Sequence, residues 1–103
     1  RRRFAMVTED QVRDALKTVK DPEVDLNVVD LGLIYDVKVE DSTAYVRMTL
    51  TSPGCPAGPQ ILHGAKQAVE ALEGVELAEI ELTWTPFWTP ERINPEIRAM
   101  MGL

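Results

Sequence analysis

The sequence has little cysteine and histidine, the residues that most often build metal centres and thiol active sites. It contains one cysteine, Cys55, and one histidine, His63. A single cysteine cannot form an internal disulfide, which is typical of proteins in a reducing compartment. Structural zinc takes four ligands, and iron–sulfur clusters usually take four cysteines. Any metal or cluster that Cys55 contacts therefore needs further ligands from carboxylates, a small thiol, a partner protein or a second subunit.

The sequence also lacks long apolar runs and an excess of positive charge. No stretch approaches the ~20 apolar residues that cross a bilayer, and the first residues lack the apolar segment of a signal peptide. We therefore expect a cytoplasmic protein that does not bind membranes. The formal net charge is -6, with acids spread along the chain, so there is no basic face to bind nucleic acid.

The overall composition is that of one folded domain. The 103 residues are too few for two ordinary domains, and a hydrophobic content of 45% supplies a substantial core. We expect a single domain over residues 1–103.

Apolar residues recur at helical spacing in two segments, and capping signals mark a third helix. Thr8 and Gln11 have the pattern of a capping box, which predicts a helix over about 9–19. A second helix is expected over 61–72, and a short third one begins at Pro95.

Apolar and other residues alternate in three further segments, which predicts strands. Residues 33–39 and 44–50 form a hairpin, and a third strand covers 77–84. The order α-β-β-α-β-α predicts an α+β fold, a two-layer α/β sandwich with helices on one face of a three-stranded sheet. The second helix favours a parallel third strand beside 44–50 and a mixed sheet, although pairing against 33–39 stays open. The solvent face should carry Asp36, Lys38, Arg47, Glu79 and Glu81.

Cys55 lies in the loop between the strand over 44–50 and the helix over 61–72. The N–H groups and the dipole of a helix N-terminus favour negative charge, so a thiolate forms more easily there. Gly54 and Gly58 permit close backbone approach, and Pro56 preorganises the turn into the helix. A cysteine presented for chemistry and a cysteine buried in a tight turn are both compatible with this spacing.

The only histidine is a poor catalytic partner for this thiol. His63 follows Cys55 by eight positions, about two helical turns or roughly 12 Å along a helix axis. Nucleophilic catalysis normally needs a base beside the sulfur. We therefore expect no thiol enzyme, and we assign no catalytic residue.

Other residues near the predicted loops carry weaker signals. Asp21 and Glu23 flank Pro22 and suit either a binding pocket or an ordinary turn after a helix. Thr49 and Thr51 share a strand face near Cys55, which simple β-propensity also explains.

Aromatic residues in the tail suggest two roles. Trp84 should continue the buried face of the third strand. Phe87 and Trp88 either cover the core or form a contact for a partner protein.

Three segments together resemble the iron–sulfur cluster assembly domain family. They are DPEVDLNVVDLGLIYDV (21–37), MTLTSPGCPAG (48–58) and TWTPFWTPERI (83–93). The resemblance is to the branch with SufT-type maturation factors, PaaD-type proteins and the eukaryotic cytosolic targeting factor. PaaD-type proteins carry a cysteine-rich C-terminal segment that this sequence lacks, so the SufT-like form is the better match.

The resemblance implies a role in iron–sulfur protein maturation, with cluster assembly or transfer to client apoproteins. It implies that Cys55 is the reactive or cluster-contacting group and that Asp21, Glu23 and Thr51 line its pocket, while Trp88 matches an aromatic position of the family. A transient cluster or iron is expected, with none firmly bound by one chain. Expected partners are client apoproteins and the assembly machinery. A homodimer would bring two Cys55 thiols together, although nothing in the sequence requires one. The alternative is an adaptor without metal, serving an iron–sulfur or phenylacetate-oxygenase type complex.

Overall fold

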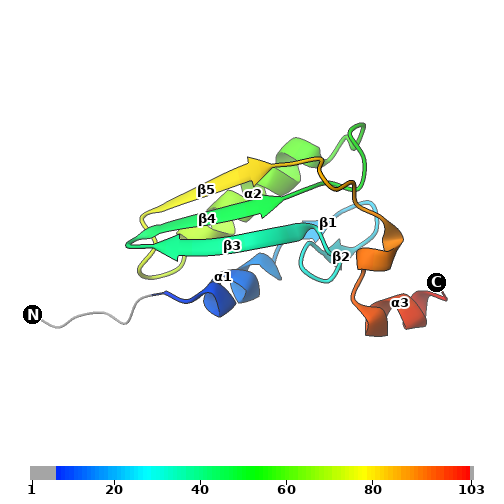
Figure 1. Cartoon of the computed structure of the whole chain (residues 1–103), viewed down its shortest axis with the longest axis horizontal. Helices are drawn as coiled ribbons and strands as arrows, with labels where there is room; N and C mark the ends of the chain where they lie inside the picture. Colours follow the sequence, from blue (N-terminus) through cyan, green and yellow to red (C-terminus); the bar gives the residue numbers. More distant parts are fainter. Residues whose placement is uncertain (1–6, 103) are drawn as a thin grey trace, which may run out of the picture.

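A three-stranded sheet forms one layer of the molecule, and two helices cover one of its faces (Figure 1). The structure is a computed structural model that describes residues 7–102. Its elements are α1 (Glu9–Leu16), β1 (Lys20–Asp21), β2 (Leu26–Asn27), β3 (Ile34–Glu40), β4 (Thr43–Met48), α2 (Gly58–Glu70), β5 (Leu77–Leu82), the 3-10 helix η1 (Pro90–Arg92) and α3 (Pro95–Met101). The predicted α+β sandwich is confirmed.

The strand order β3-β4-β5 gives the mixed sheet that the sequence favours. β3 and β4 form an antiparallel hairpin, with a register irregularity between Ile34 and Asp36. β5 pairs in parallel with β4, with Met48 opposite Leu82 at the end. The alternative in which the third strand pairs with β3 is wrong, because α2 returns the chain to the starting edge of β4 as a crossover helix.

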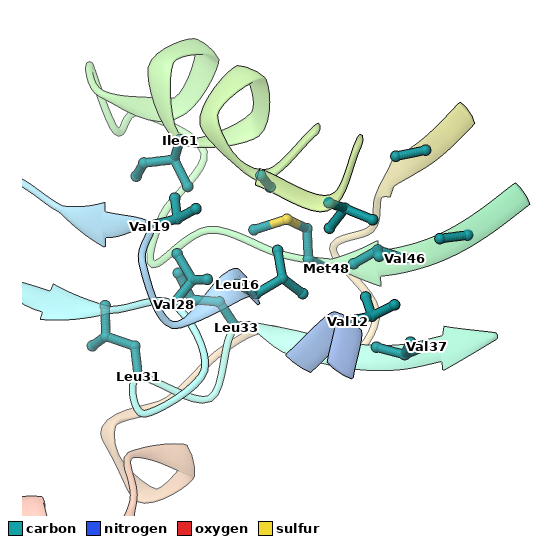
Figure 2. Close-up of a cluster of buried hydrophobic side chains, with 14 of the residues drawn as sticks. Val12, Leu16, Val19, Val28, Leu31, Leu33, Val37, Val46, Met48 and Ile61 are labelled. Carbon is teal, nitrogen blue, oxygen red and sulfur yellow. The ribbon is translucent and has the colours of Figure 1, made fainter. Parts of the chain in front are cut away.

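The core lies between the sheet and the helices α1 and α2 (Figure 2). Val12 and Leu16 from α1 and Ile61 from α2 are at most 1% exposed, and they face Val37 and Met48 of the sheet. The five charged residues expected on the opposite face are all exposed. Burial of one sheet face and two helix stripes accounts for the layered architecture.

The first helix is shorter than predicted, because α1 ends at Leu16 and not near residue 19. Its capping box is present, with the Thr8 hydroxyl accepting from the Gln11 N–H. At the other end the N–H groups of Thr18 and Val19 bond back by three residues, which tightens the last turn. The chain then enters β1, whose pairing with β2 forms a small second sheet. Two-residue strands are too short to leave an alternating pattern in a sequence.

The last strand is also shorter than predicted, because β5 ends at Leu82 and Trp84 lies beyond it. Leu82 is 38% exposed, so the alternation that predicts its burial is misleading. Thr85 N–H donates to the Thr83 hydroxyl at 3.2 Å, a local turn that redirects the chain away from the sheet. Trp84 is half-buried and packs against the core from this tail.

Candidate functional site

The loop that carries Cys55 and the tail that carries Phe87 begin side by side. β4 and β5 are parallel, so both strands end at the same edge of the sheet. The Thr83 N–H donates to the Met48 carbonyl at 2.9 Å and ties the two exits together. The turn between β1 and β2 lies at the same end of the long axis (Figure 1). We call these three segments, residues 21–26, 49–57 and 83–94, the loop end.

Cys55 is partly exposed and packs in part against the core. Its N–H donates to the Ser52 carbonyl, and its own carbonyl accepts from the Gly58 N–H, each at 3.2 Å. α2 begins at Gly58 with Ala57 as its N-cap, so Cys55 precedes the helix and is not in its first turn. No side chain caps this helix and its first turn has no acid. Cys55 is therefore a partly exposed residue just before an uncapped helix N-terminus.

The glycine that allows close backbone approach is Gly58 and not Gly54. A Cβ on Gly58 would lie 2.8 Å from Leu50 Cδ1, whereas a Cβ on Gly54 would meet nothing within 4 Å. Gly54 and Pro56 are both exposed. The predicted close approach therefore holds at Gly58 and is wrong at Gly54, because the tight contact is between the start of α2 and Leu50, which follows β4.

Asp21 is a buried carboxylate at 1% exposure. Its Oδ1 accepts from the Glu23 N–H at 2.9 Å, and its carbonyl accepts from the Asp25 N–H at 2.8 Å. These bonds close the turn between β1 and β2, which supports the ordinary-turn interpretation. No ion pair joins Asp21 to a cation within residues 7–102, although buried carboxylates are usually paired. Glu23 is exposed on the same turn.

The two threonines do not share an open face, in contrast to the prediction. β4 ends at Met48, and Met48, Thr49 and Leu50 are buried in succession. The Thr49 N–H donates to the Leu33 carbonyl at 2.9 Å and its hydroxyl donates to the Leu50 carbonyl at 3.4 Å. Thr49 is therefore a structural residue of the core edge. Thr51 is partly exposed in the Cys55 loop.

The tail aromatics divide into an anchor and an exposed residue. The Trp88 indole N–H donates to the Leu31 carbonyl at 2.6 Å, which fixes the tail to the segment before β3. Phe87 is 66% exposed. Of the two residues predicted as a partner contact, Phe87 is thus the accessible one.

Hydrogen bonds do not join Cys55 to the acidic residues or to Thr51 of the predicted site. Within residues 7–102 neither a hydrogen bond nor an ion pair links Cys55 with Asp21, Glu23 or Thr51. The same part of the chain has no group of three or more His, Cys, Asp or Glu placed to hold a metal ion. His63 is exposed on α2. None of the helices described is long and apolar enough to cross a membrane.

The comparisons with known proteins identify the family of the chain. Residues 9–82 match the family described as iron–sulfur cluster assembly protein. The chain belongs to this family. The match includes Asp21, Thr51 and Cys55, whereas Phe87 and Trp88 lie after it.

Two proteins that are named as Fe-S protein maturation auxiliary factors and one solved structure resemble the chain over most of its length. An Fe-S protein maturation auxiliary factor of Porphyromonas gingivalis is 43% identical over 96% of this chain and 94% of its own. The Fe-S protein maturation auxiliary factor SufT of Staphylococcus aureus is 37% identical over 82% of this chain and 98% of its own. The structure of a conserved hypothetical protein, TM0487 of Thermotoga maritima, superposes with a TM-score of 0.84 at 46% identity, covering 95% of this chain and 97% of that one. The predicted family and its SufT-like branch are confirmed.

Proposed function

We propose that this member of the family matures iron–sulfur proteins, and that Cys55 contacts iron or a cluster during assembly or transfer to client apoproteins. The observation that carries the proposal is the partly exposed thiol in the β4–α2 loop, inside the segment that matches the iron–sulfur cluster assembly family. The cluster is cargo and not a resident group. Client apoproteins and the assembly machinery are the partners.

The chemistry available to Cys55 is that of a single thiolate ligand. The thiol of Cys55 binds iron as a thiolate, after its proton has passed to solvent or to a nearby base. Since residues 7–102 offer no group of three or more ligands, the remaining ligands come from a client, a small thiol or the Cys55 of a second copy. A site completed in this way releases its cargo readily, because part of the ligand shell leaves with the partner. The role is that of an assembly factor and not of a thiol enzyme.

Anaerobic reconstitution with iron and sulfide tests the role of Cys55. We expect wild type to bind iron or a cluster and to support maturation of a client apoprotein, and Cys55→Ser to lose both. The matched control is Cys55→Ser combined with Ser52→Cys, which keeps one thiol in the exposed part of the same loop. If neither wild type nor Cys55→Ser binds iron and client maturation is complete with Cys55→Ser, the metal-handling role is wrong.

Asp21 and Glu23 are proposed to line the same pocket together with Thr51. The substitution Asp21→Asn removes the buried charge and keeps an acceptor oxygen for the Glu23 N–H. The turn should survive, with a loss of at most about 1 kcal/mol in unfolding free energy. Client maturation should fall sharply. Full maturation with Asp21→Asn would leave the carboxylate with the structural role of closing the turn.

A second candidate is an adaptor without metal, serving an iron–sulfur or phenylacetate-oxygenase type complex. The contact of Cys55 with the core and the absence of a multi-ligand group in the described residues favour it. Alkylation of Cys55 at increasing pH separates the two candidates. A thiol that reacts in the folded protein supports metal handling, and a thiol that reacts only after unfolding supports the adaptor.

A further inference from the structure

A shallow hollow of about 430 Å³ lies between the start of β3, the end of β4 and the tail. Its lining residues are Gly32, Ile34, Tyr35, Arg47, Pro86 and Arg92. Two of these six are arginines and none is acidic, although the chain as a whole has a formal net charge of -6. Two arginines therefore line one hollow of a protein whose overall charge is negative.

The tail holds Arg92 in a fixed position at this hollow. The guanidinium carbon of Arg92 lies 4.8 Å from the centroid of the Tyr35 ring, which is within cation–π range. The Tyr35 hydroxyl donates to the Pro86 carbonyl at 2.8 Å, which joins β3 to the tail. Gly32 lies so close to the backbone of Arg92 that a Cβ there would be 2.7 Å from the Arg92 carbonyl carbon. Three contacts thus position Arg92: its contact with the Tyr35 ring, the hydrogen bond from Tyr35 to Pro86, and the close approach of Gly32 to the Arg92 backbone.

The second positive charge at the hollow is that of Arg47, which lies on the solvent face of the sheet. It lies opposite Asp36 on β3 and Glu81 on β5. Neither acid lies within ion-pair distance of Arg47, since the ion pairs of residues 7–102 are Lys20–Asp25 and Lys66–Glu70. Both acids line a neighbouring depression on the sheet, which Arg47 also borders, and they do not line this hollow. The guanidinium groups of Arg47 and Arg92 are exposed and have no carboxylate partner in the part of the chain that is described.

We propose that this hollow binds an acidic segment of a partner protein, with a carboxylate held by Arg47 and Arg92. Guanidinium groups bind carboxylates with two parallel hydrogen bonds, which gives geometric as well as electrostatic preference. The surroundings favour a protein over a small anion, because Ile34, Tyr35 and Pro86 line the hollow and Phe87, which follows Pro86 in the chain, is exposed. Arginine and aromatic residues are enriched in protein interfaces. The proposed function is needed only to say what kind of protein the partner is, namely a client or a component of the assembly machinery.

Fluorescence anisotropy with a labelled peptide of alternating glutamate and leucine tests the hollow directly. We expect wild type to bind this peptide and to bind the matching glutamine–leucine peptide much more weakly. Arg47→Gln and Arg92→Gln should each weaken binding about fivefold, and the double variant at least tenfold. Phe87→Ala should also weaken binding about fivefold, because it removes exposed apolar surface beside Pro86.

Lys38→Gln is the matched control, because it removes one positive charge from the same sheet face outside the hollow. It should change peptide affinity less than twofold. The proposal is overturned if Lys38→Gln weakens binding as much as the arginine variants, or if the glutamine peptide binds equally well. It is also overturned if inorganic phosphate binds as tightly as the peptide with the same arginine dependence, since the hollow is then a small-anion site.

Iron and sulfide are left out of this assay, so its failure is separate from a failure of the role of Cys55. Circular dichroism and thermal unfolding verify that each variant is folded. Arg92→Lys retains the charge without the flat guanidinium, and it should recover only part of the lost affinity.

Discussion

The sheet with α1 and α2 differs from the loop end in what holds it together. The sheet and its helices share a core whose side chains are almost completely buried (Figure 2). We call the sheet with α1 and α2 the body. The loop end adds only Leu50, Ala57 and Ile93 to the buried core, and individual hydrogen bonds, such as Trp88 to Leu31 and Asn94 to Asp30, join much of the rest to the body. A core of many contacts is stable to small changes of sequence elsewhere, whereas single bonds make loops easy to alter. The molecule thus presents adjustable segments on a stable support.

The largest effect is expected from Leu16→Ala, which tests the body. Leu16 is fully buried at the end of α1 and lies in the core shown in Figure 2. The substitution should lower the unfolding free energy by about 2–5 kcal/mol through lost burial and the cavity that remains. Urea unfolding measures it, and Leu82→Ala on the exposed end of β5 is the control, with an expected loss below about 1 kcal/mol. Equal losses would mean that the core does not dominate stability.

Periodicity predicts the body because each element buries one face. The alternation in β3 and β4 and the stripe in α2 follow directly from that requirement. The same periodicity predicts ends for α1 and β5 that lie too late in the chain. Local turns at Thr18 and Thr83 end both elements before the apolar pattern ends. Pattern alone places elements well and their ends poorly.

The second prediction concerns Gly32→Ala, which tests how the loop end is attached. Gly32 has a φ of 80°, and a Cβ there would overlap the backbone of Arg92. The left-handed conformation and the overlap should together cost about 2 kcal/mol and displace the tail. Tryptophan fluorescence should report a change around Trp88, whose indole bonds to the adjacent Leu31.

Gly102→Ala separates the two causes, because Gly102 has the same φ of 80° and no atom within 4 Å of the added Cβ. It should cost about 1 kcal/mol and leave the fluorescence unchanged. If both variants behave alike, the tail does not depend on the contact between Gly32 and Arg92.

Only part of the candidate site is visible in the sequence. Cys55 stands out because it is the single thiol and lies between a strand and a helix. The partial burial of Cys55 and the inward position of Thr49 depend on where β4 ends, which alternation does not fix. No pattern singles out Arg92 beside Tyr35, because 57 positions separate them and only the folded tail brings them together.

The smallest effect is expected from Glu70→Gln, which tests a polar link within the body. Glu70 Oε2 accepts from the Ala78 N–H at 3.0 Å and from the Lys66 ammonium at 2.9 Å, so one carboxylate connects α2 with β5. The bond from the Ala78 N–H, and then Lys66, lower the pKa of Glu70 from its ordinary value of 4.5. A carboxyl group with a lowered pKa in the folded protein contributes stability above its unfolded pKa and loses it as the pH falls through the folded pKa.

The difference in unfolding free energy between wild type and Glu70→Gln should therefore be constant near neutral pH and should shrink below about pH 4.5. Urea unfolding over that pH range measures the difference. Glu73→Gln, exposed on the turn after α2, is the control for the loss of one negative charge. A difference that does not shrink on acidification would assign the effect of Glu70→Gln to hydrogen-bond geometry and not to charge. The link between α2 and β5 at Glu70, Lys66 and Ala78 would then depend on hydrogen bonds, as the loop end does, and the contrast between the two regions would become weaker.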